Sequence, residues 1–138
     1  MLLKGLFKHT KIPLLSKSLR ASAIRQRVIA NNIANSTTLG YRRLDVRFEE
    51  DLQKALRRKK IDGSMSHQKH IPVGGPSVSR IEPKVYRIDD ATNPSGVNNV
   101  DIEFEMAQLA KNQMLYIAAA KFAAGNFAKI KMAIRGRA

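Results

Sequence analysis

The last third of the chain carries a regular apolar repeat, which constrains the fold more than any other feature. Between residues 102 and 134, side chains recur in alternating steps of four and three over ten positions, and nine of the ten are apolar or aromatic. This spacing is that of a coiled-coil seam along one side of an α-helix. The members are Ile102, Met106, Leu109, Gln113, Tyr116, Ala120, Ala123, Phe127, Ile130 and Ile134. The repeat predicts one long helix from about Val100 to Gly136.

A helix of about 33 residues is ~50 Å long at a rise of about 1.5 Å per residue. This length exceeds the size of a compact globule built from a chain of 138 residues. The apolar side of such a helix therefore needs partners. One candidate is a second helix of the same chain, and the excess of apolar surface indicates other subunits as well.

Residues 14–35 show helical spacing with two apolar stripes on nearly opposite sides. The first stripe contains Leu15, Leu19, Ala23, Ile29, Ala30, Ile33 and Ala34. The second contains Leu14, Ala21, Ile24 and Val28. A surface helix usually has one stripe, so two stripes predict neighbours on two sides. A plainer interpretation makes this segment the central helix of a small bundle.

The expected architecture is mainly α-helical, with long N- and C-terminal helices packing as a coiled coil around a loop-rich, partly disordered middle. Residues 41–60 predict a second, short helix, because apolar side chains recur there at helical spacing. They are Leu44, Phe48, Leu52, Ala55 and Leu56. Residues 61–100 are rich in glycine and proline and predict loop, with a short strand within "VSRIEPKVYRI" at 78–88.

The formal net charge of +14 indicates an anionic or acidic partner. Residues 1–60 hold 15 basic and 4 acidic side chains, and no acid precedes Asp45. A basic protein that binds nucleic acid or an anionic surface without sequence specificity is therefore an alternative function. The chain lacks a helix-turn-helix pattern, a zinc set and an aromatic platform, so nucleic-acid recognition is not expected.

Several kinds of chemistry are excluded or disfavoured by the motifs. The chain has no cysteine, which rules out disulfides and thiolate metal sites. His67 and His70 have no nearby acid or cysteine to complete a metal set, and no catalytic signature is present. We therefore expect no enzyme activity, no cofactor and no metal. No apolar run approaches the roughly 20 residues of a membrane-spanning helix, and the first residues do not resemble a cleaved signal peptide.

Two stretches resemble one bacterial family. "RQRVIANNIANSTTLGYRRLDVRFEEDLQKAL" resembles the N-terminal signature of flagellar rod and hook axial proteins, in which an asparagine-rich helix end runs into a T-P-G-Y motif. "NNVDIEFEMAQLAKNQMLYIAAAKFAAGNFAKIKMAIRGR" resembles the C-terminal helix of the proximal rod members. The chain has Leu39 where the family usually has proline. Gly40 must therefore supply most of the turn.

The resemblance implies a structural subunit of the proximal flagellar rod, located in the periplasm as part of the basal body. It implies export through the flagellar type III apparatus without a cleaved signal peptide. The implied partners are copies of the same chain, other rod subunits, a FliE-type adaptor and the MS ring below. It also divides the chain into a segment for export and helical polymerisation (1–40), a short helix with a variable loop-rich region (41–100) and a C-terminal coiled-coil helix (101–138).

In this interpretation the function depends on subunit packing through both terminal helices. On the first helix, Leu15, Leu19, Ile29 and Ile33 are expected to meet the C-terminal seam, and the stripe with Ile24 and Val28 to face an adjacent subunit. On the C-terminal helix, the packing residues are Met106, Leu109, Gln113, Tyr116, Phe127, Ile130 and Ile134. The motif "NNIANSTTLGY" is expected to stop the helix through Gly40 and Tyr41. Its three amides, Asn31, Asn32 and Asn35, would offer hydrogen bonds to a neighbouring subunit.

Overall fold

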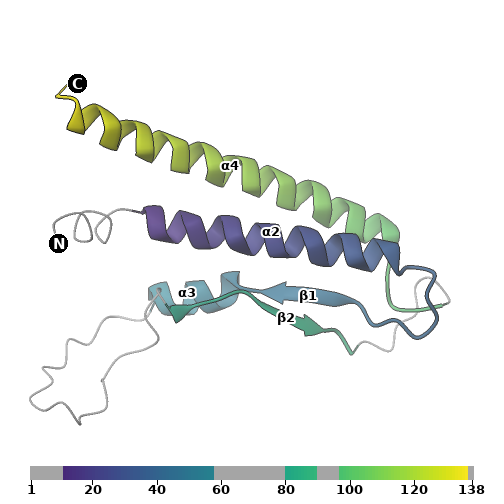
Figure 1. Ribbon diagram of the computed structural model, residues 1–138. Coiled ribbons are helices and arrows are strands. Elements are labelled where there is room, and N and C mark those ends of the chain that lie inside the picture. The colour runs from purple at the N-terminus through teal and green to yellow at the C-terminus, as the bar shows by residue number, and fades with distance from the viewer. Residues whose placement is uncertain (1–10, 58–79, 90–96, 137–138) are drawn as a thin grey trace, which may run out of the picture.

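The computed structural model describes residues 11–57, 80–89 and 97–136. Along the described chain, the elements are α2 (Ile12–Ala34), β1 (Leu44–Arg47), α3 (Glu49–Arg57), β2 (Lys84–Arg87) and α4 (Ile102–Ile134). They form three layers, in which α2 lies between α4 on one side and the β1–β2 ribbon with α3 on the other (Figure 1). The expectation of long terminal helices that pack together is confirmed.

Local sequence explains where the two long helices begin and end. Pro13 lies in the first turn of α2, where its missing N–H costs nothing. The α4 helix is capped by Asp101, whose carboxylate accepts hydrogen bonds from the backbone N–H groups of Glu103 and Phe104. The helix ends at Ile134, and Gly136, two residues later, has φ = 64° and so adopts the left-handed conformation typical of a residue just after a helix.

The predicted strand is confirmed, and the predicted helix over 41–60 is only partly correct. Strand β2 lies within 78–88 and pairs antiparallel with β1, with Leu44 opposite Arg87 and Arg47 opposite Lys84. The helix begins only at Glu49. Because Val46 and Phe48 are buried and Arg47 is exposed, the chain before α3 alternates with the period of a strand.

A small apolar core joins α2 to the ribbon layer. Ala21 of α2, Phe48 and Ile81 are buried against one another, and Leu52 and Ala55 of α3 pack on this cluster. Ala21 was expected to face an adjacent subunit. That expectation is wrong for the single chain, since the chain's own Phe48 and Ile81 cover it.

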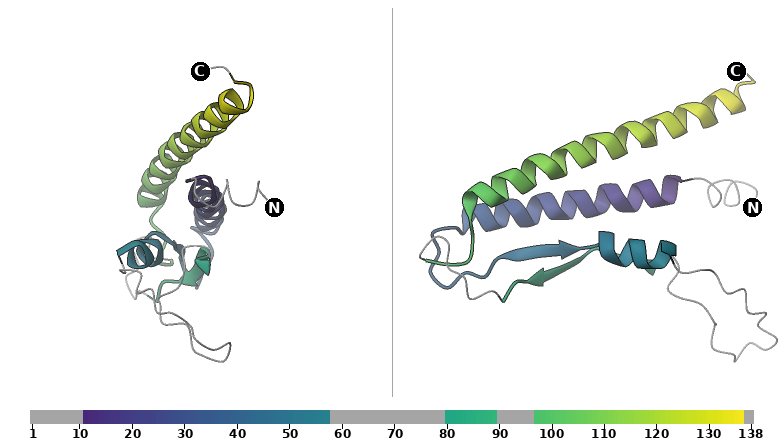
Figure 2. Two further views of the ribbon diagram at one scale, coloured as in Figure 1. Left: turned by 90° about the vertical axis from the view of Figure 1, so that its left-hand side faces the viewer. Right: turned by 180° about the vertical axis from the view of Figure 1, so that it is seen from behind.

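The opposite contact, between α2 and α4, has an unusual polarity. The buried residues of α4 are Glu105, Asn112 and Ala119, which are spaced by seven residues, and Asn112 donates to the Ser22 carbonyl of α2. Most large apolar side chains of α4 are exposed, although Leu109 and Ile130 are half-buried. The two helices are closest where α2 ends and α4 begins, and they diverge toward the C-terminus (Figure 2).

The apolar seam coincides only in part with the face by which α4 contacts its own α2, since Leu109, Ala120, Ala123 and Ile130 are half-buried while the other seam members are exposed. Ile102, Met106, Phe127 and Ile134 are 48%, 53%, 52% and 75% exposed. The contact is centred instead on the polar residues described above and on Ala119. Polar partners on α2 and the ribbon, together with the small alanine, favour this rotation of α4 about its axis.

Candidate functional site

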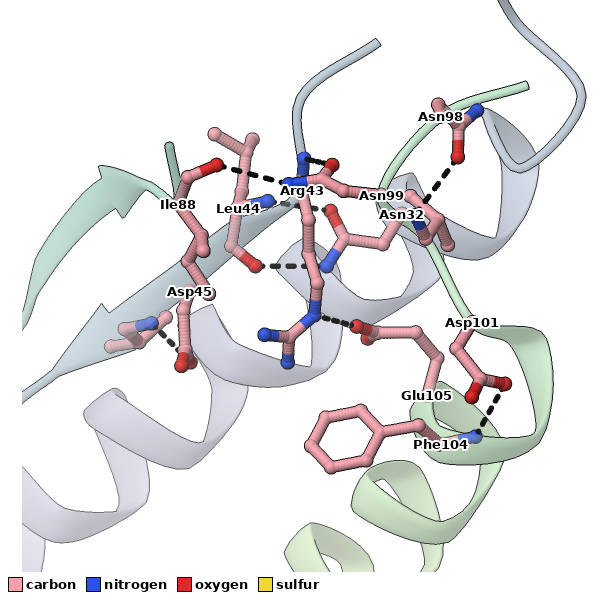
Figure 3. A network of polar contacts seen from close by, with 12 residues as sticks. Asn32, Arg43, Leu44, Asp45, Ile88, Asn98, Asn99, Asp101, Phe104 and Glu105 are labelled. Atoms are coloured by element: carbon pink, nitrogen blue, oxygen red, sulfur yellow. Dashed lines mark hydrogen bonds and ion pairs between the residues drawn. The ribbon is translucent and has the colours of Figure 1, made fainter. Parts of the chain in front are cut away.

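Asn32, in the last turns of α2, joins the helix to the ribbon. The side chain is completely buried. Its Nδ2 donates to the Leu44 carbonyl at 2.8 Å, and its Oδ1 accepts from the Leu44 N–H and the Tyr41 hydroxyl, both at 3.0 Å. Asn32 therefore pairs with Leu44 as a neighbouring strand would, and it fixes the start of β1 against α2 (Figure 3).

The Tyr41 hydroxyl is a donor that stays protonated. Burial raises the pKa of Tyr41 above its ordinary value of 10.0, and the negative charge of Glu105 raises it further, while Arg87 acts in the opposite direction. The phenol thus remains neutral and keeps its hydrogen bond to Asn32 throughout the physiological range.

Asn98, which lies just before α4, caps the C-terminus of α2. Its Nδ2 donates to the carbonyls of Asn35, Ser36 and Thr38, at 3.0, 2.9 and 3.0 Å. Its Oδ1 accepts from the Val100 N–H at 2.9 Å. These carbonyls belong to the C-cap residue Asn35 and to the turn that follows α2, so the Asn98 side chain ties the segment before α4 to this turn.

The adjacent Asn99 holds the ribbon. Its Nδ2 donates to the Ile88 carbonyl at 3.0 Å, and its Oδ1 accepts from the Arg43 N–H at 2.7 Å. The Ile88 N–H in turn donates to the Arg43 carbonyl at 2.9 Å. Asn99 therefore bridges the two chain segments that flank the paired strands.

The turn after α2 explains the role of Gly40. The Tyr41 N–H donates to the Thr38 carbonyl at 3.2 Å, and Gly40, the third residue of this turn, has φ = 71°. A positive φ at this position is the arrangement of a type II turn, in which proline is common at the second position. Leu39 occupies that second position and is 86% exposed. The prediction that Gly40 supplies the turn is consistent with this geometry.

Arg43 and Glu105 form the ionic part of the junction between α2, the ribbon and α4. The Arg43 Nε donates to Glu105 Oε1 at 2.5 Å, and the guanidinium lies 4.7 Å from the centre of the Phe104 ring. Glu105 is completely buried, and the Arg43 side chain is 17% exposed. Within the described part of the chain, nothing donates to Glu105 Oε2 or to the buried Asn112 Oδ1. Both atoms are costly to bury without a donor.

A model of flagella basal body rod proteins matches residues 16–42, which contain most of α2, Asn32 and the Gly40 turn. The chain is 33% identical to the flagellar basal body rod protein FlgB of Borreliella burgdorferi, over 94% of this chain and 93% of the relative. It is 34% identical to FlgB of Escherichia coli, over 72% and 75%, and 30% identical to FlgB of Bacillus subtilis, over 96% and 98%. The chain belongs to the FlgB family of flagellar basal body rod proteins.

Membership of the FlgB family agrees with the resemblance noted in the sequence. The comparisons give no support to the alternative of a nonspecific nucleic-acid or anionic-surface binder. In the described ranges, no three His, Asp or Glu side chains are grouped to hold a metal ion. His67 and His70 lie outside those ranges. No described helix is sufficiently long and apolar to cross a membrane.

The structure uses the asparagines of the FlgB-like signature within the chain itself. Asn32 is buried, so the prediction that it offers hydrogen bonds to a neighbour is wrong for this residue. Asn35 Nδ2 donates to the carbonyl and to Oδ1 of Asn31, at 2.8 and 2.7 Å. Of the three, Asn31 is exposed and Asn35 is half-buried, whereas the period of the helix directs Asn32 toward the ribbon.

The packing residues predicted on α2 are mostly covered by the chain. Ile29 and Val28 are buried, and the others are half-buried: Leu15, Leu19, Ile24 and Ile33. Val28 was expected to face another subunit, and that expectation is wrong for the single chain. Both stripes of α2 are used because α2 is the middle layer of this fold, as in the plainer bundle interpretation.

The packing residues predicted on α4 lie mainly on the surface. Leu109 and Ile130 are half-buried, whereas the rest are exposed: Met106, Gln113, Tyr116, Phe127 and Ile134. Further large apolar side chains are exposed around the helix, namely Phe104, Met114, Leu115, Ile117, Phe122 and Met132. We call this set of exposed side chains the outer face of α4.

Sequence reasoning missed three residues that hold the junction: Asn98, Asn99 and Asn112. The signal for Asn98 and Asn99 was an Asn pair directly before the helix cap Asp101. Glu105 and Asn112 are polar residues one heptad apart on an otherwise apolar helix. Such placement indicates a polar contact inside a packed face.

Proposed function

We propose that this chain is a structural subunit of the proximal flagellar rod, which polymerises through its terminal helices into the periplasmic drive shaft. The observation that carries the proposal is the outer face of α4. A helix of 33 residues exposes many of its large apolar side chains, while its buried positions are Glu105, Asn112 and Ala119. Exposed apolar surface on this scale is typical of protein–protein contact.

The partners follow from this assignment. The outer face of α4 meets neighbouring copies and other rod subunits, and the base of the assembly meets a FliE-type adaptor and the MS ring. The chain reaches the periplasm through the flagellar type III export apparatus without a cleaved signal peptide. Family membership supports these proposals, since the relatives named above are basal body rod proteins.

Acidic substitutions on α4 and α2 test the proposal, because they separate folding from assembly. Phe127→Asp changes a residue that is 52% exposed, so the monomer should keep its helical circular dichroism and its melting temperature. The same variant should fail to restore motility to cells that lack this subunit, since an unpaired carboxylate would be buried between subunits.

Two further variants complete the experiment. Lys121→Asp places the same acid at another exposed position of α4 and should restore motility. Ile29→Asp changes a buried residue and should unfold the monomer itself. Normal motility with Phe127→Asp, or equal loss with Lys121→Asp, would contradict packing through the outer face.

A further inference from the structure

A narrow stripe of exposed side chains lies along one side of α4, apart from the apolar seam. Its members are Phe104, Lys111, Leu115, Phe122 and Lys129. All five are exposed, and at about 3.6 residues per turn they lie about 60–100° round the helix from the buried Asn112. Exposed seam residues such as Phe127 lie about 40–120° round on the opposite side. We call these five residues the lysine stripe, which is one part of the exposed surface of α4.

The spacing of the lysine stripe indicates a helical partner. Its members follow one another at steps of seven, four, seven and seven residues, which is the repeat of a coiled-coil contact. Three of the five side chains are large and apolar, and Phe104, Leu115 and Phe122 are 45%, 49% and 68% exposed. A narrow apolar stripe with this repeat packs along the side of a second helix.

A hollow beside the first half of the stripe leaves room for side chains of a partner. It has a volume of about 330 Å³ and lies between α4, α2 and the ribbon layer, with Lys111 and Leu115 in its lining. Glu49 also lines it, but both carboxylate oxygens of Glu49 already accept hydrogen bonds from Arg25. Within the described ranges, neither Lys111 nor Lys129 forms an ion pair.

The charges of α4 indicate that the partner helix is acidic. No acid follows Glu105 in the chain, whereas α4 carries four lysines after that residue: Lys111, Lys121, Lys129 and Lys131. In coiled coils, charged side chains beside the apolar seam pair across the contact and determine the choice of partner. A helix with Asp or Glu beside its apolar positions would pair with Lys111 and Lys129, whereas a basic helix would be repelled by them.

A second copy of this chain does not supply such a surface. Outside α4, the exposed large apolar side chains of the described residues are few and scattered over other elements: Leu39, Leu56, Val85, Tyr86 and Val97. The α4 helix of a second copy is apolar, but it would bring lysines to the lysine stripe. In an antiparallel pair, Asp101 and Glu103 would reach only the last turns, and such a two-fold pair closes on itself instead of growing into a rod.

We infer that the lysine stripe binds an acidic amphipathic helix of a different rod subunit. Phe104, Leu115 and Phe122 lie against the apolar side of that helix, and Lys111 and Lys129 pair with its carboxylates. The inference rests on the proposed function, and it assigns one part of the exposed surface of α4 to a contact between unlike subunits. The seam on the other side of α4 is left to other neighbours.

Two synthetic helical peptides test the inference with the purified full chain. Both consist of three heptads with leucine at the two apolar positions. One carries glutamate at the positions beside the leucines, and the other carries lysine there. Dissociation constants are measured by the fluorescence anisotropy of the labelled peptides at physiological ionic strength. We expect the glutamate peptide to bind at least about ten times more tightly than the lysine peptide.

Substitutions in the chain locate the binding on the lysine stripe. Lys111→Glu combined with Lys129→Glu should abolish the preference for the glutamate peptide, because the stripe then carries carboxylates. Lys54→Glu combined with Lys84→Glu changes the net charge equally at exposed positions of α3 and β2, and this control should keep the preference. Phe122→Asp should weaken binding of the glutamate peptide at least about tenfold. Circular dichroism checks that each variant keeps its helices.

Equal affinity for the two peptides would overturn the inference, and so would a preference that survives Lys111→Glu with Lys129→Glu. Self-association of the purified chain that Phe122→Asp abolishes would overturn it in favour of a second copy. Binding to phosphatidylglycerol vesicles that depends on Lys111 and Lys129 would overturn it in favour of a membrane surface. None of these results decides rod assembly, which is tested separately by the motility of the Phe127→Asp strain.

Discussion

At the scale of single residues, four asparagine side chains form hydrogen bonds of the kind that backbone groups usually form with one another. Asn32, Asn98, Asn99 and Asn112 each hydrogen-bond a backbone group of a separate part of the chain. An amide side chain has both a donor and an acceptor, so it can substitute for a missing strand or helix partner. The junction between α2, the ribbon and α4 therefore depends on polar side chains more than on apolar volume.

Asn32→Ala tests this dependence. The change removes hydrogen bonds to both backbone groups of Leu44 and to Tyr41, leaving buried polar groups without partners. We expect a loss of about 2–3 kcal/mol in the free energy of unfolding, measured by urea denaturation. The control is Asn31→Ala at the exposed neighbouring position, which should change stability by less than about 0.5 kcal/mol. Equal losses in the two variants would contradict the assignment.

Glu49 gives the fold a dependence on acid pH. Burial alone would raise the pKa of Glu49, but the hydrogen bond from Arg25 and its positive charge outweigh it, so the pKa lies below the ordinary 4.5. A lowered pKa in the folded state means that the contribution is present above pH 4.5 and is lost as pH falls through the folded value. The Glu49 side chain is 59% exposed, so the contribution is at most about 1 kcal/mol.

We therefore expect Glu49→Gln to be less stable than the parent chain at pH 7, and the difference to shrink as the pH falls from 4.5 toward 3. Urea midpoints recorded across this range measure the difference. Glu50→Gln, at the next exposed position, is the matched control. A difference between parent and Glu49→Gln that stays constant down to pH 3 would show that the Arg25 pair is not its source.

At the scale of elements, the turn between α2 and β1 combines an exposed Leu39 with a left-handed Gly40. Proline at the second position of such a turn restricts the unfolded chain without disturbing the folded one. Leu39→Pro should therefore raise the free energy of unfolding by about 0.4–1 kcal/mol. Thermal unfolding of the two chains measures it. Gly40→Ala, which forces a side chain into positive φ, should lower stability, and a stabilising Gly40→Ala would contradict this geometry.

The attachment of the ribbon layer depends on Phe48. This side chain is 2% exposed and packs with Ala21 and Ile81 in the apolar cluster of buried residues. Phe48→Ala should cost about 3–5 kcal/mol. The matched control is Leu56→Ala in α3, which is 58% exposed and should cost far less. Hydrogen exchange should show β1 and α3 losing protection before α4 in the Phe48→Ala chain, and simultaneous loss in all three would argue against a separate layer.

The sequence predicted the elements whose apolar pattern extends over many residues, and it failed where the pattern covers only a few residues. Over 33 residues, the repeat of α4 determined both type and bounds. Leu44 and Phe48 both fit helical spacing, yet both precede α3. Leu44 lies in a strand because β2 and Asn32 supply partners that no local pattern reveals. Contacts across more than fifty residues, such as Asn99 with Arg43, leave no trace in local periodicity.

At the scale of the whole molecule, the amphipathic pattern of α4 indicated which residues are apolar, but it did not indicate which side the chain keeps for itself. The single chain buries Glu105 and Asn112 and leaves Phe127 and Ile134 outside. A seam alone cannot distinguish a partner in the same chain from one in a neighbour. That distinction comes from the rest of the fold, where α2 already has the ribbon on one side (Figure 2).

The cap that Asn98 provides has a consequence for how the chain can vary in length. It joins positions 60 to 63 residues apart, and residues 58–79 lie between them. The entropy of closing a loop grows only with the logarithm of its length, so doubling the enclosed chain costs about 0.6 kcal/mol. The middle can therefore gain or lose whole segments at small thermodynamic cost. Insertions between α3 and β2 should leave the asparagine junction, and the two helices it aligns, in place.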